Sequence, residues 1–181
     1  LWQFGAGAVQ GGLYPAVDPS GNLYVGLQDG GFHSLSPTGT PRWKCAAGSR
    51  PGGLSNPILD AEGSVYVAMS DKLFRAVRAD DGSVRWTFTN TASLAGAVAG
   101  WDRTLYVSSS NGSLHALDSA SGATKWTFRE GIGPMTVPAL AADGTVYVGS
   151  ARLHALDGAT GARIWSFLAD DRIVSPPTIG P

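Results

Sequence analysis

Short apolar segments, separated by glycine, proline and aspartate, run through the whole chain. One is centred on a tyrosine and occurs four times, as LYVGL, VYVAM, LYVSS and VYVGS around Tyr24, Tyr66, Tyr106 and Tyr147. A second alternating segment follows each time: FHSLS, LFRAVR, LHALD and LHALD. β-Branched and aromatic residues dominate both, as is typical of strands. No window of 11 residues keeps a helical period, so we predict essentially no helix.

Tryptophan recurs along the chain with a period of about 40 residues, at Trp2, Trp43, Trp86, Trp126 and Trp165. A glycine stands four residues before each of the last four, at Gly39, Gly82, Gly122 and Gly161. Each period also holds a small apolar segment ahead of the tyrosine: YPAV, NPIL, GAVA, VPAL and, at the end, PPTI. Four short strands at this period are typical of one blade of a β-propeller.

We therefore predict an all-β fold: a β-propeller of four four-stranded antiparallel blades with an extra strand at each end. The extra strands are Trp2–Phe4, of the outer type, and Pro176–Ile179, of the inner type. The domain is expected to be a single one over 1–181, with repeats at about 5–45, 46–88, 89–128 and 129–167, and 168–181 beginning a further blade. Such a chain is either a partial ring or half of an eight-bladed ring completed by a homodimer.

Composition excludes several classes of partner. The 13 basic and 14 acidic residues are interspersed and give a net charge of −1, so we expect no nucleic-acid partner and no polybasic membrane patch. No apolar run approaches 18 residues, so no transmembrane segment is expected. The opening LWQFGAGAVQGG lacks a basic stretch followed by an apolar one, so we expect no signal peptide there. Cys45 is the only cysteine, which excludes an internal disulfide.

The segment Ala155–Trp165, ALDGATGARIW, resembles the tryptophan-docking motif of the pyrroloquinoline quinone (PQQ) type propeller repeat. A second copy, ALDSASGATKW, ends at Trp126, and the two earlier units keep less of it. The resemblance implies that each tryptophan stacks between neighbouring blades. The expected blade-docking residues are Trp43, Trp86, Trp126, Trp165, Gly39, Gly82, Gly122 and Gly161.

The family includes quinoprotein dehydrogenases, periplasmic assembly scaffolds and sensor domains of bacterial kinases. The dehydrogenases hold the quinone with a calcium ion, an acidic base and usually a vicinal disulfide. This chain has no Cys-Cys pair and no visible cluster of calcium ligands. We therefore expect no catalytic residue, cofactor or metal, and no enzyme.

Histidine and aspartate recur at equivalent repeat positions. His33, His115 and His154 share one position, which favours packing between blades over a metal site, because zinc needs about four convergent ligands. Asp118 and Asp157 precede glycine turns, where an aspartate commonly bonds turn amides, so we interpret them as structural rather than as general bases.

The turn Trp101-Asp102-Arg103 departs from the repeat, which has Asp-x-x-Gly there in the first two units. An exposed tryptophan beside an arginine is typical of a contact hot spot. The loops between blades add three arginines. The candidate partner contacts are Trp101, Arg103, Arg50, Arg129 and Arg172.

These features together favour a non-catalytic scaffold that binds a protein or peptide partner. Two alternatives stay open: the ligand-sensing domain of a larger bacterial receptor, and a fragment of a PQQ-dependent dehydrogenase. The resemblance implies an extracytoplasmic location in a bacterium.

Overall fold

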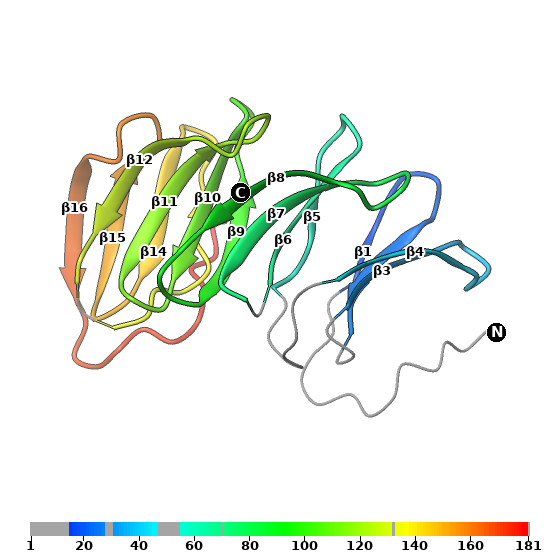
Figure 1. The fold of residues 1–181 in the computed structure, drawn as a ribbon. Coiled ribbons are helices and arrows are strands. Elements are labelled where there is room, and N and C mark those ends of the chain that lie inside the picture. Colours follow the sequence, from blue (N-terminus) through cyan, green and yellow to red (C-terminus); the bar gives the residue numbers. More distant parts are fainter. Residues whose placement is uncertain (1–14, 28–30, 47–54, 70, 132, 181) are drawn as a thin grey trace. The chain divides into compact units, whose positions relative to one another are not determined.

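The computed structural model describes residues 15–27, 31–46, 55–69, 71–131 and 133–180, and these contain strands and no helix (Figure 1). The strands form four antiparallel sheets of four, each in chain order. The first two sheets comprise β1 (Ala16–Val17), β2 (Leu23–Gly26), β3 (Gly31–Leu35), β4 (Pro41–Ala46), then β5 (Ile58–Leu59), β6 (Ser64–Ala68), β7 (Leu73–Arg78), β8 (Val84–Thr89). The third and fourth comprise β9 (Leu94–Ala99), β10 (Thr104–Ser109), β11 (Ser113–Asp118), β12 (Thr124–Arg129), then β13 (Ala139–Leu140), β14 (Thr145–Gly149), β15 (Arg152–Asp157), β16 (Arg163–Leu168). The predicted all-β architecture of four four-stranded sheets is confirmed.

The prediction of an extra strand at Pro176–Ile179 is wrong, because residues 169–180 form no strand. Pro176 and Pro177 have no N–H to donate to a ladder. The inner strands β1, β5 and β13 have two residues each and β9 has six, and each pairs with the tyrosine strand that follows it, as Ala16 pairs with Tyr24. The other expected extra strand, Trp2–Phe4, lies outside the described residues.

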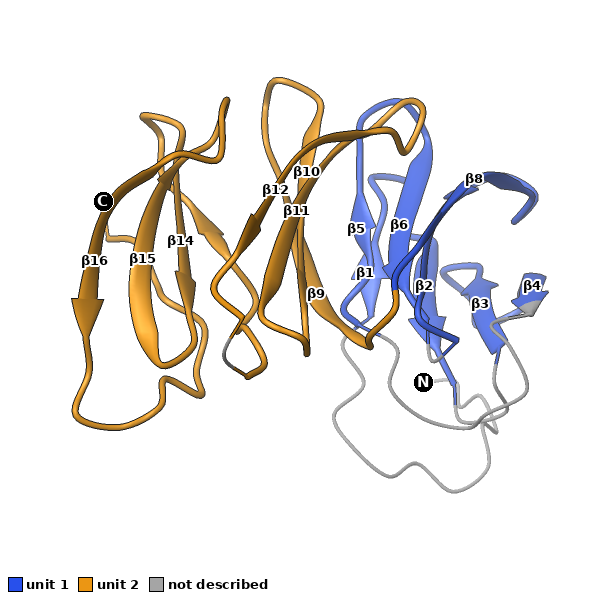
Figure 2. Ribbon diagram, turned by 60° about the vertical axis from the view of Figure 1, so that its left-hand side comes forward, with its two compact units in different colours: residues 1–90 blue, residues 91–181 orange. Residues whose placement is uncertain are grey.

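The chain divides into an N-terminal unit, residues 1–90, and a C-terminal unit, residues 91–181, each containing two sheets (Figure 2). In the N-terminal unit the core joins β2 and β3 to β6 and β7, with Tyr24, Phe32, Val65 and Val67 fully buried. In the C-terminal unit Tyr106 and Leu114 of the third sheet pack with Val146 and Leu156 of the fourth. Within each unit, therefore, two sheets share one apolar layer.

The central and outer strands differ in burial. β6 and β10 are buried along their whole length. The outer strands β8 and β12 instead alternate between exposed and half-buried residues. Among the described residues, no helix has the length and hydropathy needed to cross a membrane.

Candidate functional site

Trp126 of β12 joins the two sheets of the C-terminal unit. Its Nε1 donates to the carbonyl oxygen of Gly158 at 2.9 Å, on the turn that follows β15. The hydroxyl of Tyr106 donates to the same oxygen at 3.1 Å. The indole also lies against Gly161, where an added Cβ would come within 2.6 Å of the ring. Trp126 and Tyr106 of the third sheet thus both bind the Gly158 carbonyl oxygen of the fourth sheet, and Gly161 leaves room for the indole.

Trp43 of β4 makes the same contact in the N-terminal unit. Its Nε1 donates to the Ala79 carbonyl oxygen at 3.0 Å, and an added Cβ on Gly82 would lie 2.5 Å from the indole. Arg42, the neighbour of Trp43, donates to the same carbonyl at 3.2 Å. Gly82 and Gly161 both have positive φ, 73° and 74°, so neither position suits a side chain for conformational reasons either.

Each of the other two tryptophans packs against the tyrosine of its own sheet, as Trp43 and Trp126 also do. Trp86 is half-buried, with its ring centroid 5.8 Å from that of Tyr66 and 6.0 Å from that of Phe74. Trp165 packs at 5.8 Å from Tyr147, but 43% of it is exposed. Gly39 and Gly122 have φ of 81° and 73°, so the glycine four residues before each of the four tryptophans adopts the same left-handed turn.

A second interaction holds the tyrosine strands in the first two sheets. Tyr24 donates to Asp18 at 2.9 Å, and Tyr66 donates to Asp60 at 2.6 Å. In each case the aspartate stands six residues before the tyrosine, in the turn that opens the strand. In the third sheet this position is Gly100, so Tyr106 has no such carboxylate.

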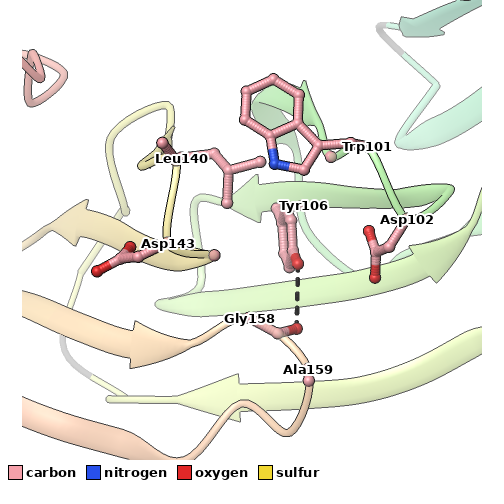
Figure 3. Close-up of a pocket in the computed structure, with 10 residues that line it drawn as sticks. Trp101, Asp102, Tyr106, Leu140, Asp143, Gly158 and Ala159 are labelled. Carbon is pink, nitrogen blue, oxygen red and sulfur yellow. Dashed lines mark hydrogen bonds between the residues drawn. The ribbon is translucent and has the colours of Figure 1, made fainter. Parts of the chain in front are cut away.

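The missing carboxylate coincides with a pocket of about 250 Å³ in the C-terminal unit (Figure 3). Trp101 and Leu140 lie on one side of Tyr106, and the Gly158–Ala159 turn lies on the other. Glycines form much of the remaining wall. The pocket is lined by Gly100, Trp101, Asp102, Tyr106, Leu140, Ala142, Asp143, Gly144, Gly158 and Ala159.

Trp101 is the most accessible large aromatic among the described residues, with 77% of its surface exposed. Its turn also places a non-glycine residue in the left-handed backbone region. Arg103 has φ of 60° at the repeat position that Gly21, Gly63 and Gly144 fill with φ of 81°, 77° and 87°. A non-glycine residue in this region costs about 1–2 kcal/mol. Backbone strain of this kind is concentrated at functional sites, so the turn is a candidate site.

The pocket is acidic. Asp102 accepts from the Thr104 amide at 3.2 Å and the Thr104 hydroxyl at 2.7 Å, and Lys125 Nζ lies 3.9 Å from its carboxylate. The Thr145 amide donates to Asp143 at 2.9 Å and holds the pKa of that carboxyl below its usual value. Both residues are exposed, and no cationic residue lines the pocket. Its lining therefore carries two negative charges at neutral pH.

The predicted arginine contacts are not gathered at this pocket. Arg103 is exposed in the same turn but does not line it. Arg129 ends β12 and Arg172 follows β16, both at the opposite end of their sheets. Arg172 lines a different pocket with Asp170 and Asp171 and donates to the Pro134 carbonyl at 3.1 Å. Arg50 lies outside the described residues.

The three histidines lie in the packed interior, at 8%, 6% and 0% exposure for His33, His115 and His154. His115 Nδ1 is 3.1 Å from the Thr127 hydroxyl. His154 Nε2 is 3.0 Å from a carboxylate oxygen of Glu130, which also contacts the Ser150 hydroxyl. The contact between His154 and Glu130 was not predicted, because nothing in the repeat pattern pairs a strand histidine with the residue that follows β12. No group of three or more metal-ligating side chains occurs in the part of the chain that the structure describes.

The aspartates before the glycine turns hold those turns together. Asp157 accepts from the Thr160 amide and hydroxyl, both at 2.8 Å, and Asp118 accepts from the Ser121 amide and hydroxyl at 2.9 and 2.8 Å. These hydrogen bonds, the hydroxyl ones foremost, lower the pKa of both carboxyls. A carboxylate used in this way is a poor general base.

Three solved structures have the same fold as this chain. BamB from Moraxella catarrhalis is 20% identical with a TM-score of 0.70, over 83% of this chain and 50% of that protein. The computationally designed Ika8 protein is 12% identical with a TM-score of 0.79, over 92% and 52%. Quinohemoprotein alcohol dehydrogenase from Comamonas testosteroni is 18% identical with a TM-score of 0.68, over 86% and 34%.

The chain thus spans about half the length of the first two of these structures, or less in the third. No curated protein matches the sequence. The family described as "Outer membrane protein assembly factor BamB" matches residues 1–127 and 110–180, which is nearly the whole chain. The docking of tryptophans between sheets is consistent with this match. The chain therefore belongs to that family of PQQ-like repeat β-propellers.

Proposed function

We propose that this chain is a non-catalytic β-propeller scaffold that binds a protein or peptide partner. The observation that carries the proposal is Trp101, which is 77% exposed, beside a pocket, in a turn that departs from the repeat. Exposed tryptophans of this kind often dominate the binding energy of protein interfaces. The family description, an assembly factor, supports the same class of function.

The residues present do not fit the quinone site of the dehydrogenases that share the repeat. Cys45 is the only cysteine, so a vicinal disulfide cannot form. The described residues hold no cluster of three acidic or histidine side chains for a calcium ion. We derive no redox step for this chain. PQQ can be titrated into the protein in the presence of calcium while the absorbance of the quinone is measured. Saturable binding would support the dehydrogenase alternative.

Site-specific photo-crosslinking tests the scaffold. The full-length protein is expressed in the cells from which it comes. A benzophenone amino acid replaces Trp101 in it. A matched control replaces Ala120, which is exposed in a turn of the same sheet. We expect one defined protein adduct at position 101 and none at 120. No adduct at either position, or equal adducts at both, would contradict the proposal.

The outer strand β16 presents a second surface. Ile164, Phe167 and Leu168 are exposed by 57%, 63% and 60%, beside the half-exposed Trp165. The equivalent tryptophans Trp43 and Trp126 dock on the turn of a following sheet. We propose that another blade covers β16, supplied in the isolated chain by a second copy in a homodimer.

A further inference from the structure

We infer that the pocket beside Trp101 receives an arginine side chain of the protein partner. This inference rests on the proposed scaffold function and names the chemistry of one contact in it. The pocket combines an exposed indole, two carboxylates and a wall of backbone, and each of these suits a guanidinium group.

Size favours a single side chain over a cofactor. Pockets for drug-sized ligands measure about 300–1,000 Å³ and enclose most of the ligand. At about 250 Å³ this pocket is smaller, and it is open at the rim, where Trp101 stands. A planar side chain inserted from the surface fits these limits.

Charge favours a cation. Asp102 and Asp143 lie on opposite sides of Tyr106 in Figure 3. Lys125 neutralises the charge of Asp102 only in part. Its Nζ lies 3.9 Å from that carboxylate and donates its hydrogen bond to Thr104 Oγ1 at 2.6 Å instead. A second cation at the rim would therefore meet an unbalanced negative field.

The indole and the glycines favour arginine over other cations. A guanidinium stacks on an aromatic face and donates in several directions at once, whereas an ammonium is a strongly hydrated point charge. Gly100, Gly144 and Gly158 add no side chains to the wall, so the pocket stays open to a planar group. The position six residues before Tyr106 is Gly100, so no carboxylate fills the space there, and the Tyr106 hydroxyl donates to the Gly158 carbonyl oxygen.

Titration with N-acetyl-arginine amide tests the inference, with N-acetyl-citrulline amide as the neutral isostere. The readout is the indole N–H resonance of Trp101, assigned by its loss in Trp101→Phe. Exposed cation–π contacts and ion pairs are individually weak. We therefore expect saturable shifts with a dissociation constant above about 1 mM. The citrulline amide should bind at least about threefold more weakly.

Neutralising variants make the test specific. Asp102→Asn combined with Asp143→Asn should abolish the preference for arginine, whereas Asp81→Asn, in an exposed turn of the N-terminal unit, should leave it intact. Equal shifts with both amides would overturn the inference, as would an unmoved Trp101 resonance or an unchanged response in the folded double variant.

The two proposals fail separately. Adducts at position 101 without arginine selectivity would leave the scaffold in place and refute the arginine contact. Arginine selectivity without any adduct would refute the scaffold, and the arginine recognised by the pocket would then not belong to a protein partner.

Discussion

At the scale of single residues, the glycine before a docked tryptophan is constrained both by its positive φ and by the indole ring beside it. Two glycine variants can separate these effects. Gly161 and Gly144 both have positive φ, 74° and 87°, but an added Cβ contacts the Trp126 ring only at Gly161. We expect Gly144→Ala to cost about 1 kcal/mol of unfolding free energy, from backbone strain alone. Gly161→Ala should cost about 1–3 kcal/mol more through overpacking. Urea denaturation measures both, and equal losses would contradict the docking contact.

The buried His115 makes stability depend on pH. Burial, and secondarily the nearby Arg129 guanidinium, lower the pKa of His115 below its ordinary value of about 6.5. The unfolded chain therefore takes up this proton at a higher pH than the folded chain. The contribution of neutral His115 is complete above the unfolded pKa and is lost as the pH falls from there through the folded pKa.

NMR titration of the His115 ring checks this expectation, with the urea-unfolded chain as the reference. The folded ring should titrate below the unfolded one. Arg129→Gln should narrow the difference without removing it, because burial is the larger cause. A folded pKa at or above the reference would show the prediction to be wrong.

At the scale of the strand, Trp126 links two sheets and Trp101 links none. Trp126→Ala removes a partly buried ring and a hydrogen bond to Gly158, so we expect a loss of about 3 kcal/mol in unfolding free energy. Trp101→Ala, at a residue 77% exposed, should change it by less than about 0.5 kcal/mol. Denaturation of the two variants side by side gives the comparison. Similar losses would mean that Trp101 is structural.

The strands were predictable because each type carries its own local signal. Alternation around Tyr24, the glycine before Trp43 and the period between units all lie close together in sequence. The pocket was not predictable in this way. Its lining joins the turn at Gly100 and Trp101 to the turns at Asp143 and Gly158, which are far apart in the sequence. The departure at Trp101 was visible in the sequence, but its exposure and its glycine-walled neighbourhood are tertiary facts.

At the scale of the whole molecule, β16 differs from β12 at its exposed positions. Ile164 and Leu168 stand where β12 has Lys125 and Arg129. We expect light scattering to give twice the chain mass at high concentration, and Ile164→Lys with Leu168→Arg to shift the mass toward the monomer. Val84→Lys, at an exposed position of β8, is the control. A monomer at every concentration would refute the homodimer.

The carbonyl that receives each docked tryptophan belongs to the main chain, on Ala79 in one unit and Gly158 in the other. The hydrogen bond itself uses no side chain of the residue that accepts it, so an alanine and a glycine serve equally at the two joints. The Trp101 turn can therefore differ from the repeat while the docking of Trp126 on Gly158 stays intact.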